Sequence, residues 1–141
     1  MTQTYAKLLS KTDVGENGTH QGGICVPKSL TPFFPNLNTK RFNPDVWLEL
    51  VDTEGYRWPM RYLYYNGRTF NPPKNTRNEY RITHMSKFFK SWNITAGDSI
   101  LFTSTEHKLV YKVSISSKEN PLEIQTPRKE IIKLSGWNRI C

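Results

Sequence analysis

The sequence has few of the residues on which disulfide-stabilised proteins depend, and no segment typical of membrane proteins. Only two of its 141 residues are cysteines, Cys25 and Cys141, and they lie far apart. A secreted disulfide scaffold carries more, so we expect a reducing, cytoplasmic environment. No apolar run approaches the roughly 20 residues of a transmembrane helix. The N-terminus also lacks the apolar segment of a signal peptide, and no membrane partner is expected.

Recognisable catalytic and zinc-binding arrangements are missing as well. The three histidines, His20, His84 and His107, are scattered, and neither cysteine pairs with one of them at zinc-finger spacing. No Ser or Cys lies in a nucleophile motif, and no Gly-Lys-Ser/Thr follows the glycines of segment 15–23. The sequence therefore predicts a domain without a catalytic site and without a cofactor for binding.

Positive charge is what the chain has in excess, with a formal net charge of +8. The excess lies in one central stretch, because residues 57–90 contain eight Lys or Arg side chains and one acidic side chain, Glu79. Such a cluster is typical of a protein that binds a polyanion. A solvated basic face with no partner is equally compatible with the charge, which suggests nucleic acid without establishing it.

Short β-like runs separated by Gly, Pro and Asn predict a mainly β barrel or sandwich in one domain, residues 1–141. Aromatic residues make up 13% of the chain, which argues against intrinsic disorder. The runs 99–103 and 109–115, joined by a polar segment, predict a hairpin. The expected strands are 5–10, 24–26, 46–51, 60–65, 80–83, 99–103, 109–115 and 130–134.

Two short helices are expected beside the strands. Met85, Phe88, Phe89 and Trp92 are spaced i, i+3, i+4 and i+7, which predicts one apolar stripe on an amphipathic helix. A stripe of this kind most often packs into the core, and a groove for a partner is the alternative. A second short helical turn is expected at 29–34.

Two long segments, 11–23 and 66–79, are rich in Gly, Asn or Pro and resist assignment as strands. Long loops inside a compact domain are usually functional, so we expect both to bind a partner. A mobile polar loop is the alternative reading. The side chains in and before the first loop that can form hydrogen bonds with DNA are Lys7, Ser10, Lys11, Asp13, Asn17, His20 and Gln21, of which Asp13 can only accept from base edges.

The segment 76–83 contains the most distinctive local pattern. In an extended backbone Arg77, Glu79 and Arg81 point to the same side, roughly 6.6 Å apart. This spacing is about two base-pair steps of a duplex. Arg reads guanine through O6 and N7, and Glu accepts from cytosine N4, so the pattern suits G·C pairs in the major groove. An exposed strand edge with internal ion pairs explains the same residues.

Three motifs in the same order give the chain a family resemblance. The stretch 7–27, the triplet Tyr64-Tyr65-Asn66 and the stretch 74–83 resemble the N-terminal recognition domain of EcoRII-type restriction endonucleases. The resemblance covers roughly residues 7–103. Such domains are similar in fold to the plant B-three DNA-binding domains. The resemblance therefore implies a DNA-binding pseudobarrel of about seven strands with one or two short helices.

The resemblance also implies two arms that grip the major groove of double-stranded DNA. The N-arm is about 7–21 and the C-arm about 74–81. Tyr80 departs from the family pattern, in which a Lys stands, and this leaves one DNA contact in doubt. The DNA-binding residues expected in the two arms are Lys7, Ser10, Lys11, Asp13, Gly15, His20, Gln21, Lys74, Arg77, Asn78, Glu79, Tyr80 and Arg81.

Family members recognise 5′-CCWGG (W is A or T) or related GC-rich sites. The resemblance thus implies a monomeric effector domain that senses such a site. It would control a catalytic nuclease domain of the same polypeptide, outside this sequence, and magnesium is expected only for that domain.

Two alternatives come from other classes of protein. Asp45, Glu106 and Lys108 fit a loose nuclease pattern, although some sixty residues separate its two halves. Nicking of plasmid DNA with magnesium would identify such an enzyme. The second alternative is a single-strand or RNA binder that stacks bases on Tyr56, Trp58 and Tyr62. Competition between duplex and single strand would identify that binder.

Overall fold

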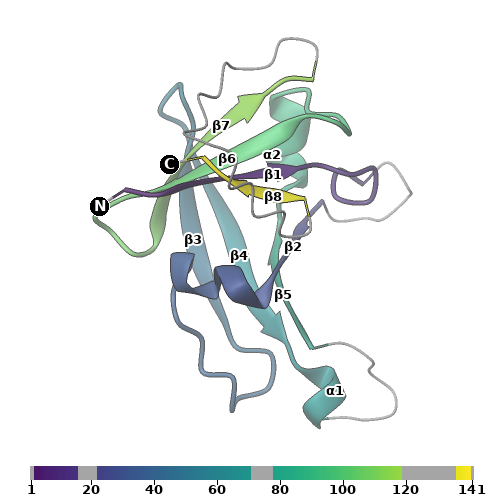
Figure 1. Cartoon of the computed structure of the whole chain (residues 1–141), viewed down its shortest axis with the longest axis vertical. Coiled ribbons are helices and arrows are strands. Elements are labelled where there is room, and N and C mark those ends of the chain that lie inside the picture. Colours follow the sequence, from purple (N-terminus) through teal and green to yellow (C-terminus); the bar gives the residue numbers. More distant parts are fainter. Residues whose placement is uncertain (1, 16–21, 71–77, 119–135, 141) are drawn as a thin grey trace.

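The computed structural model describes residues 2–15, 22–70, 78–118 and 136–140. One curled sheet dominates it, with the strand order β2-β5-β4-β3-β7-β6-β1-β8 (Figure 1). Neighbouring strands are antiparallel except β3 and β7, which run parallel. The strands are β1 (Thr4–Leu8), β2 (Ile24–Val26), β3 (Asp45–Val51), β4 (Arg57–Tyr65), β5 (Glu79–Thr83), β6 (Ser99–Ser104), β7 (Val110–Ser116) and β8 (Trp137–Arg139).

Short helices connect the strands. The 3-10 helix η1 (Lys28–Phe33) follows β2 and buries Leu30 and Phe33. The single turn α1 (Gly67–Phe70) follows β4, and α2 (Ser86–Ser91) follows β5. None of the helices in the described part of the chain is long and apolar enough to cross a membrane.

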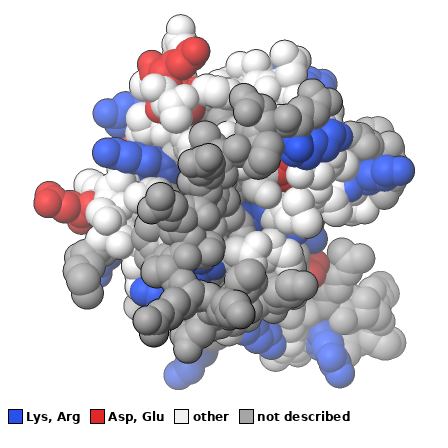
Figure 2. Space-filling view, turned by 45° about the horizontal axis from the view of Figure 1, so that its top comes forward, with Lys and Arg blue, Asp and Glu red and all other residues white. Residues whose placement is uncertain are grey.

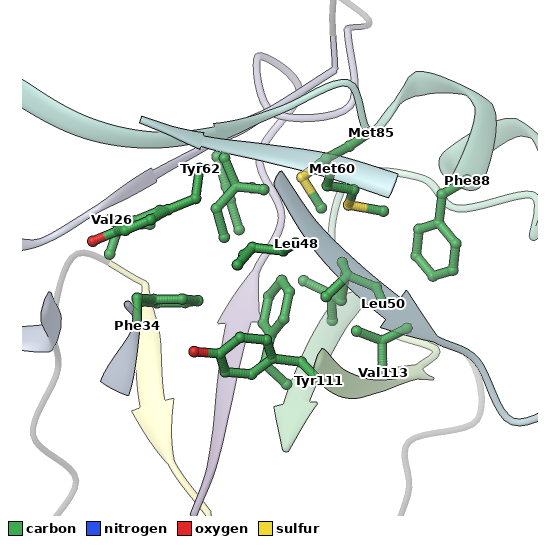
Figure 3. Close-up of a cluster of buried hydrophobic side chains, with 14 of the residues drawn as sticks. Val26, Phe34, Leu48, Leu50, Met60, Tyr62, Met85, Phe88, Tyr111 and Val113 are labelled. Atoms are coloured by element: carbon green, nitrogen blue, oxygen red, sulfur yellow. The ribbon is translucent and has the colours of Figure 1, made fainter. Parts of the chain in front are cut away.

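Aromatic side chains fill the inside of the curled sheet. Phe34 stacks on Tyr62 with ring centroids 5.0 Å apart, and Phe102 stacks on Trp137 at 5.5 Å. Figure 3 shows Phe34, Tyr62 and Tyr111 in one cluster with Leu48 and Leu50 of β3. Because stacked rings bury large apolar areas, this one core holds the strands of both halves of the sheet.

The two outermost strands of the sheet meet through a side chain. Trp137 of β8 is fully buried, and its indole Nε1 donates a hydrogen bond of 3.1 Å to the carbonyl of Cys25 in β2. No strand pairing joins β2 and β8 among the described residues. The sheet is therefore a pseudobarrel, whose seam is bridged by an indole in place of a backbone ladder.

The predicted fold class is confirmed, since the protein is mainly β with a few short helices. The hairpin of 99–103 and 109–115 corresponds to β6 and β7, and the bounds of β2 are as predicted. Met85, Phe88 and Phe89 are at most 3% exposed, which confirms that the apolar stripe belongs to the core. Trp92 is half-buried at the edge of this core.

Several expected boundaries were wrong. The first strand ends at Leu8, two residues early, because Ser10 and Asp13 form a turn. The fourth strand begins at Arg57 and includes Pro59, whose place opposite Glu49 the sequence did not indicate. Helix α1 lies at the start of the expected loop 66–79, and β8 was not predicted. The expected strand 130–134 lies outside the described residues.

Candidate nucleic-acid interface

A turn at the end of β1 forms the first stem of the N-arm. The amide of Ser10 donates to Asp13 Oδ2 at 3.0 Å, and the amide of Asp13 donates back to Ser10 Oγ at 3.1 Å. Gly15 then adopts a φ of +82°, a conformation that glycine adopts without strain. These contacts end the strand and turn the chain into the arm.

Lys7 and Asp13 form an ion pair beneath this turn. Lys7 Nζ lies 3.1 Å from Asp13 Oδ2 and donates to the carbonyl of Leu8 at 2.7 Å. Lys7 is only 7% exposed, and Gly136 lies so close that a Cβ there would be 2.9 Å from its Nζ. The structure thus gives Lys7 and Asp13 a role in shaping the stem. Their contact with DNA stays a prediction, as does that of Ser10, Lys11 and Gly15.

The second stem of the N-arm is anchored on the start of α2. The amide of Gly22 donates to Ser86 Oγ at 2.6 Å, and its carbonyl accepts from the amide of Met85 at 3.1 Å. The amide of Gly23 donates to the carbonyl of Asp13 at 3.0 Å, which ties the two stems together. Both ends of the arm therefore rest on the folded domain, while His20 and Gln21 lie outside the described residues.

The C-arm returns to the sheet at β5, where two of its predicted residues meet. Arg81 Nη1 lies 3.7 Å from Glu79 Oε1, and each side chain is 24% exposed. Their contact agrees with the expected placement of alternate residues on one face of an extended strand. Asn78 Nδ2 donates to Thr69 Oγ1 of α1 at 2.8 Å. Lys74 and Arg77 lie outside the described residues.

Cys25 joins this face, and the sequence did not identify it as a site residue. It pairs in register with Arg81, and its Sγ donates to Glu79 Oε2 at 3.6 Å. Burial raises the pKa of the Cys25 thiol, and the negative charge of Glu79 acts in the same direction. Arg81 and Lys7 act in the opposite direction. Only the β2–β5 register brings Cys25 to Glu79, and no local pattern signals it.

Tyr80 lies on the opposite face of β5. Its ring contacts Tyr64, with centroids 4.3 Å apart, and stacks on the buried Tyr62 at 5.9 Å. Burial raises the pKa of Tyr80, and the neighbouring Tyr64 adds to this effect. The residue thus packs against the core, whereas its predicted contact with DNA stays a prediction.

Asn66, the third residue of the triplet 64–66, holds the chain in place just after β4. It is 1% exposed, and its Nδ2 donates to the carbonyls of Thr39 and Arg41 at 3.2 and 2.6 Å. Its Oδ1 accepts from the amide of Asn43 at 2.8 Å. One buried amide therefore joins the loop before β3 to the end of β4, and the exposed Arg68 of α1 follows directly.

The residues of the nuclease alternative have other surroundings. Asp45 Oδ2 accepts from Arg61 Nε at 2.7 Å, whereas Glu106 and Lys108 are exposed in the β6–β7 connection. In the part of the chain that the structure describes, no three His, Cys, Asp or Glu side chains are placed to hold a metal ion.

The prediction of a base-stacking surface, which the single-strand alternative requires, was wrong. Tyr62 is 0% exposed inside the core, so a base has no access to its ring. Trp58 is half-buried against Phe88, at 5.5 Å between ring centroids, and its Nε1 donates to Asp52. Tyr56 alone is well exposed, and one ring does not make a stacking surface.

Figure 2 shows Lys and Arg side chains at several places on one face of the molecule, with acidic side chains at fewer. The described Lys and Arg side chains of the basic stretch 57–90 lie on β4, α1, β5 and α2. Its charge is complementary to that of a polyanion.

Known proteins similar to this chain fall in two groups. The type II restriction enzyme EcoRII of Escherichia coli is 35% identical over 108 residues, which are 69% of this chain and 25% of that enzyme. Auxin response factor 17 of Arabidopsis thaliana is 33% identical over 100 residues, which are 70% of this chain and 15% of that factor. The chain thus spans a quarter or less of either relative.

Solved structures show the same fold. The protein in an Arabidopsis FUS3–DNA complex superposes with a TM-score of 0.59 at 19% identity, covering 79% of this chain and 94% of the other. A hypothetical Arabidopsis thaliana protein gives 0.56 at 14% identity, covering 85% and 95%. Residues 1–119 match the family described as "Restriction endonuclease EcoRII, N-terminal". The chain therefore belongs to the EcoRII N-terminal family and has the pseudobarrel fold of the plant B-three DNA-binding domains.

Proposed function

We propose that this domain binds a specific double-stranded DNA sequence of the CCWGG type, with one arm in each half of the site. Membership of the EcoRII N-terminal family supports DNA recognition. The arms also start close together, because β2, which follows the N-arm, pairs with β5, which carries the end of the C-arm. Two arms that start side by side suit a single short site.

The observation that carries the proposal is the placement of Glu79. It is the one acidic side chain among eight basic ones in 57–90, and it contacts Arg81 on one face of β5. A carboxylate opposes binding to phosphates, so charge attraction does not explain its presence. Acceptance of a hydrogen bond from cytosine N4, beside an arginine that reads guanine, does explain it.

The domain acts, in this proposal, as the effector part of a type II restriction endonuclease. The EcoRII relative is four times as long as the segment that this chain matches. A nuclease domain in the remaining length would require magnesium, whereas the recognition domain binds DNA as a monomer and without metal. Binding of the site would then control cleavage by the other domain.

A gel-shift titration at physiological salt tests the proposal directly. One duplex contains CCWGG and the other the same bases in scrambled order, both with a chelator present. We expect the first duplex to bind at least about 100-fold more tightly, since specific sites exceed non-specific DNA by larger factors still. Equal affinity for the two duplexes would contradict the proposal.

Alanine variants test whether both arms are needed. His20→Ala and Arg77→Ala should each weaken cognate binding by about 1–3 kcal/mol, the range for one good base contact. Arg57→Ala, at an exposed arginine of β4, is the matched control. His20→Ala protein that binds the site like the wild type would remove the N-arm from the proposal.

Plasmid nicking that depends on magnesium and Asp45 would support the nuclease instead.

A further inference from the structure

The carboxylate of Glu79 is approached at both of its oxygens. Cys25 Sγ donates to Oε2 at 3.6 Å, and Arg81 Nη1 lies 3.7 Å from Oε1. The Arg81 contact is longer than an N–H···O hydrogen bond, which is ordinarily 2.7–3.2 Å. The two contacts therefore restrict where the carboxylate lies.

Cys25 itself is held by the sheet. Its backbone pairs with Arg81 across β2 and β5, and its carbonyl accepts the hydrogen bond from Trp137 Nε1 across the seam of the pseudobarrel. The Cys25 side chain therefore contacts Glu79 from a fixed backbone position, in contrast to a side chain on a loop. Functional groups are oriented most accurately when their partners stand on rigid elements.

The thiol is suited to orienting a carboxylate that must still bind something else. Because burial and Glu79 raise the pKa of Cys25 above its ordinary value, the thiol stays protonated at neutral pH and can donate. A thiol is a weak donor, and a carboxylate has about four acceptor positions. A weak donor of this kind is compatible with acceptance by the same carboxylate from a stronger donor, such as a base amino group.

We propose that Cys25 is a positioning residue for base recognition, which holds the Glu79 carboxylate in the orientation that reads the DNA site. This inference rests on the proposed function. Cys25 acts through Glu79 and makes no contact with the base. Its removal lowers discrimination between sites and leaves the attraction to DNA in general unchanged.

The test is a double-mutant cycle on the whole chain, read out as the ratio of affinities for CCWGG and scrambled duplex. Cys25→Ala should lower this ratio at least fivefold, with scrambled-duplex affinity unchanged. Cys25→Ser keeps a donor and should stay within about threefold of wild type. In a Glu79→Ala background, Cys25→Ala should have no further effect, because residues that act through one contact are not additive. Ser114→Ala, at a half-buried small residue of β7, is the matched control.

The possible failures are distinguishable. A Cys25→Ala protein that keeps the wild-type ratio, while Glu79→Ala loses it, would overturn the positioning role and leave the proposed function intact. A Glu79→Ala protein that keeps the ratio would remove base reading by Glu79, and the positioning role with it. Equal binding of both duplexes by the wild type would contradict the proposed function itself.

A spectroscopic measurement covers the case in which Cys25→Ala does not fold. In a Cys141→Ser background Cys25 is the only thiol of the chain. Its infrared S–H stretch should lie at lower wavenumber than that of a free thiol, and Glu79→Ala should shift it upward. An S–H band that does not respond to Glu79→Ala would overturn the proposal.

Discussion

Two parts of the sheet place arginines beside carboxylates and use them differently. On the β3–β4 hairpin, Arg57 Nη1 lies 2.8 Å from Glu49 Oε2, with these side chains 64% and 40% exposed. On β5, Arg81 and Glu79 are 3.7 Å apart although both are only 24% exposed. Arg57 and Glu49 are thus within hydrogen-bond distance of each other despite their exposure. The more buried Arg81 and Glu79 are farther apart. The proposed function accounts for this difference, because in it Arg81 and Glu79 contact bases as well as each other.

The turn of the same hairpin contains a third kind of carboxylate. Asp52 is 6% exposed, and its Oδ2 accepts from the indoles of Trp58 and Trp92 at 2.9 and 3.2 Å. Its Oδ1 accepts from the amides of Glu54 and Tyr56. This carboxylate accepts hydrogen bonds from two indoles and two amides of the fold, so its role is structural.

The largest effect is expected from Asp52→Ala. The substitution leaves two indoles and two amides without their acceptor, and buried donors in that state cost about 1–3 kcal/mol each. Partial access of water reduces the sum, so we expect a loss of about 3 kcal/mol in the free energy of unfolding. Urea denaturation measures it. The ratio of cognate to scrambled affinity of the folded protein should stay unchanged. A fall in that ratio would show that Asp52 also contributes to DNA recognition and would contradict its purely structural role.

Arg81→Ala and Arg57→Ala compare the two arginines directly. Arg81→Ala should weaken cognate binding by about 1–3 kcal/mol and scrambled binding far less, because base contacts discriminate. Arg57→Ala removes the same charge, and it should leave the ratio of the two affinities unchanged, because phosphate contacts do not depend on sequence. Gel-shift titrations at two salt concentrations check both variants. Parallel losses in the two variants would indicate that Arg81 attracts phosphates only.

Acid should remove the stabilisation that the structural carboxylates Asp52 and Asp98 provide. Burial alone would raise the pKa of Asp52, but hydrogen bonds from the Trp58 and Trp92 indoles and two amides outweigh it and lower the pKa. The pKa of Asp98 is likewise lowered despite burial, by hydrogen bonds from the amides of Thr95 and Lys118 and by the charge of Lys118. Their stabilisation is complete above the ordinary carboxyl pKa of about 3.9 and is lost as the pH falls through the lowered values.

Thermal melts between pH 6 and pH 2 check this expectation. Tm should fall steeply below about pH 4 for the wild type. Asp52→Asn should begin from a lower Tm and fall less steeply, since it has one titrating carboxylate fewer. Parallel curves for the two proteins would show that Asp52 contributes nothing to acid unfolding.

The smallest effect is expected from Glu49→Ala, the matched partner of Glu79→Ala. An exposed ion pair contributes about 0–1 kcal/mol, so both Tm and the affinity ratio should hardly change. Melting curves and the paired duplex titration measure the two quantities. If Glu49→Ala lowered the ratio of cognate to scrambled affinity, a carboxylate in a close, exposed ion pair would contribute to base recognition, and the contrast with Glu79 would fail.

The sequence alone determined the class of the fold and most of its elements. The apolar stripe of Met85, Phe88 and Phe89 and the short β-like runs of β6 and β7 are local patterns, so they were predictable without the structure. The pattern of Glu79 and Arg81 was readable for the same reason, because side chains two apart on a strand share a face.

Only the tertiary structure decided what those residues contact. Strand β8 is three residues long, and its place depends on the burial of Trp137 against Phe102, which no local pattern indicates. The meeting of Cys25 with Glu79 depends on the register of two strands 54 positions apart in sequence. Such pairings are set by long-range packing, and packing is a property of the whole core and not of any segment.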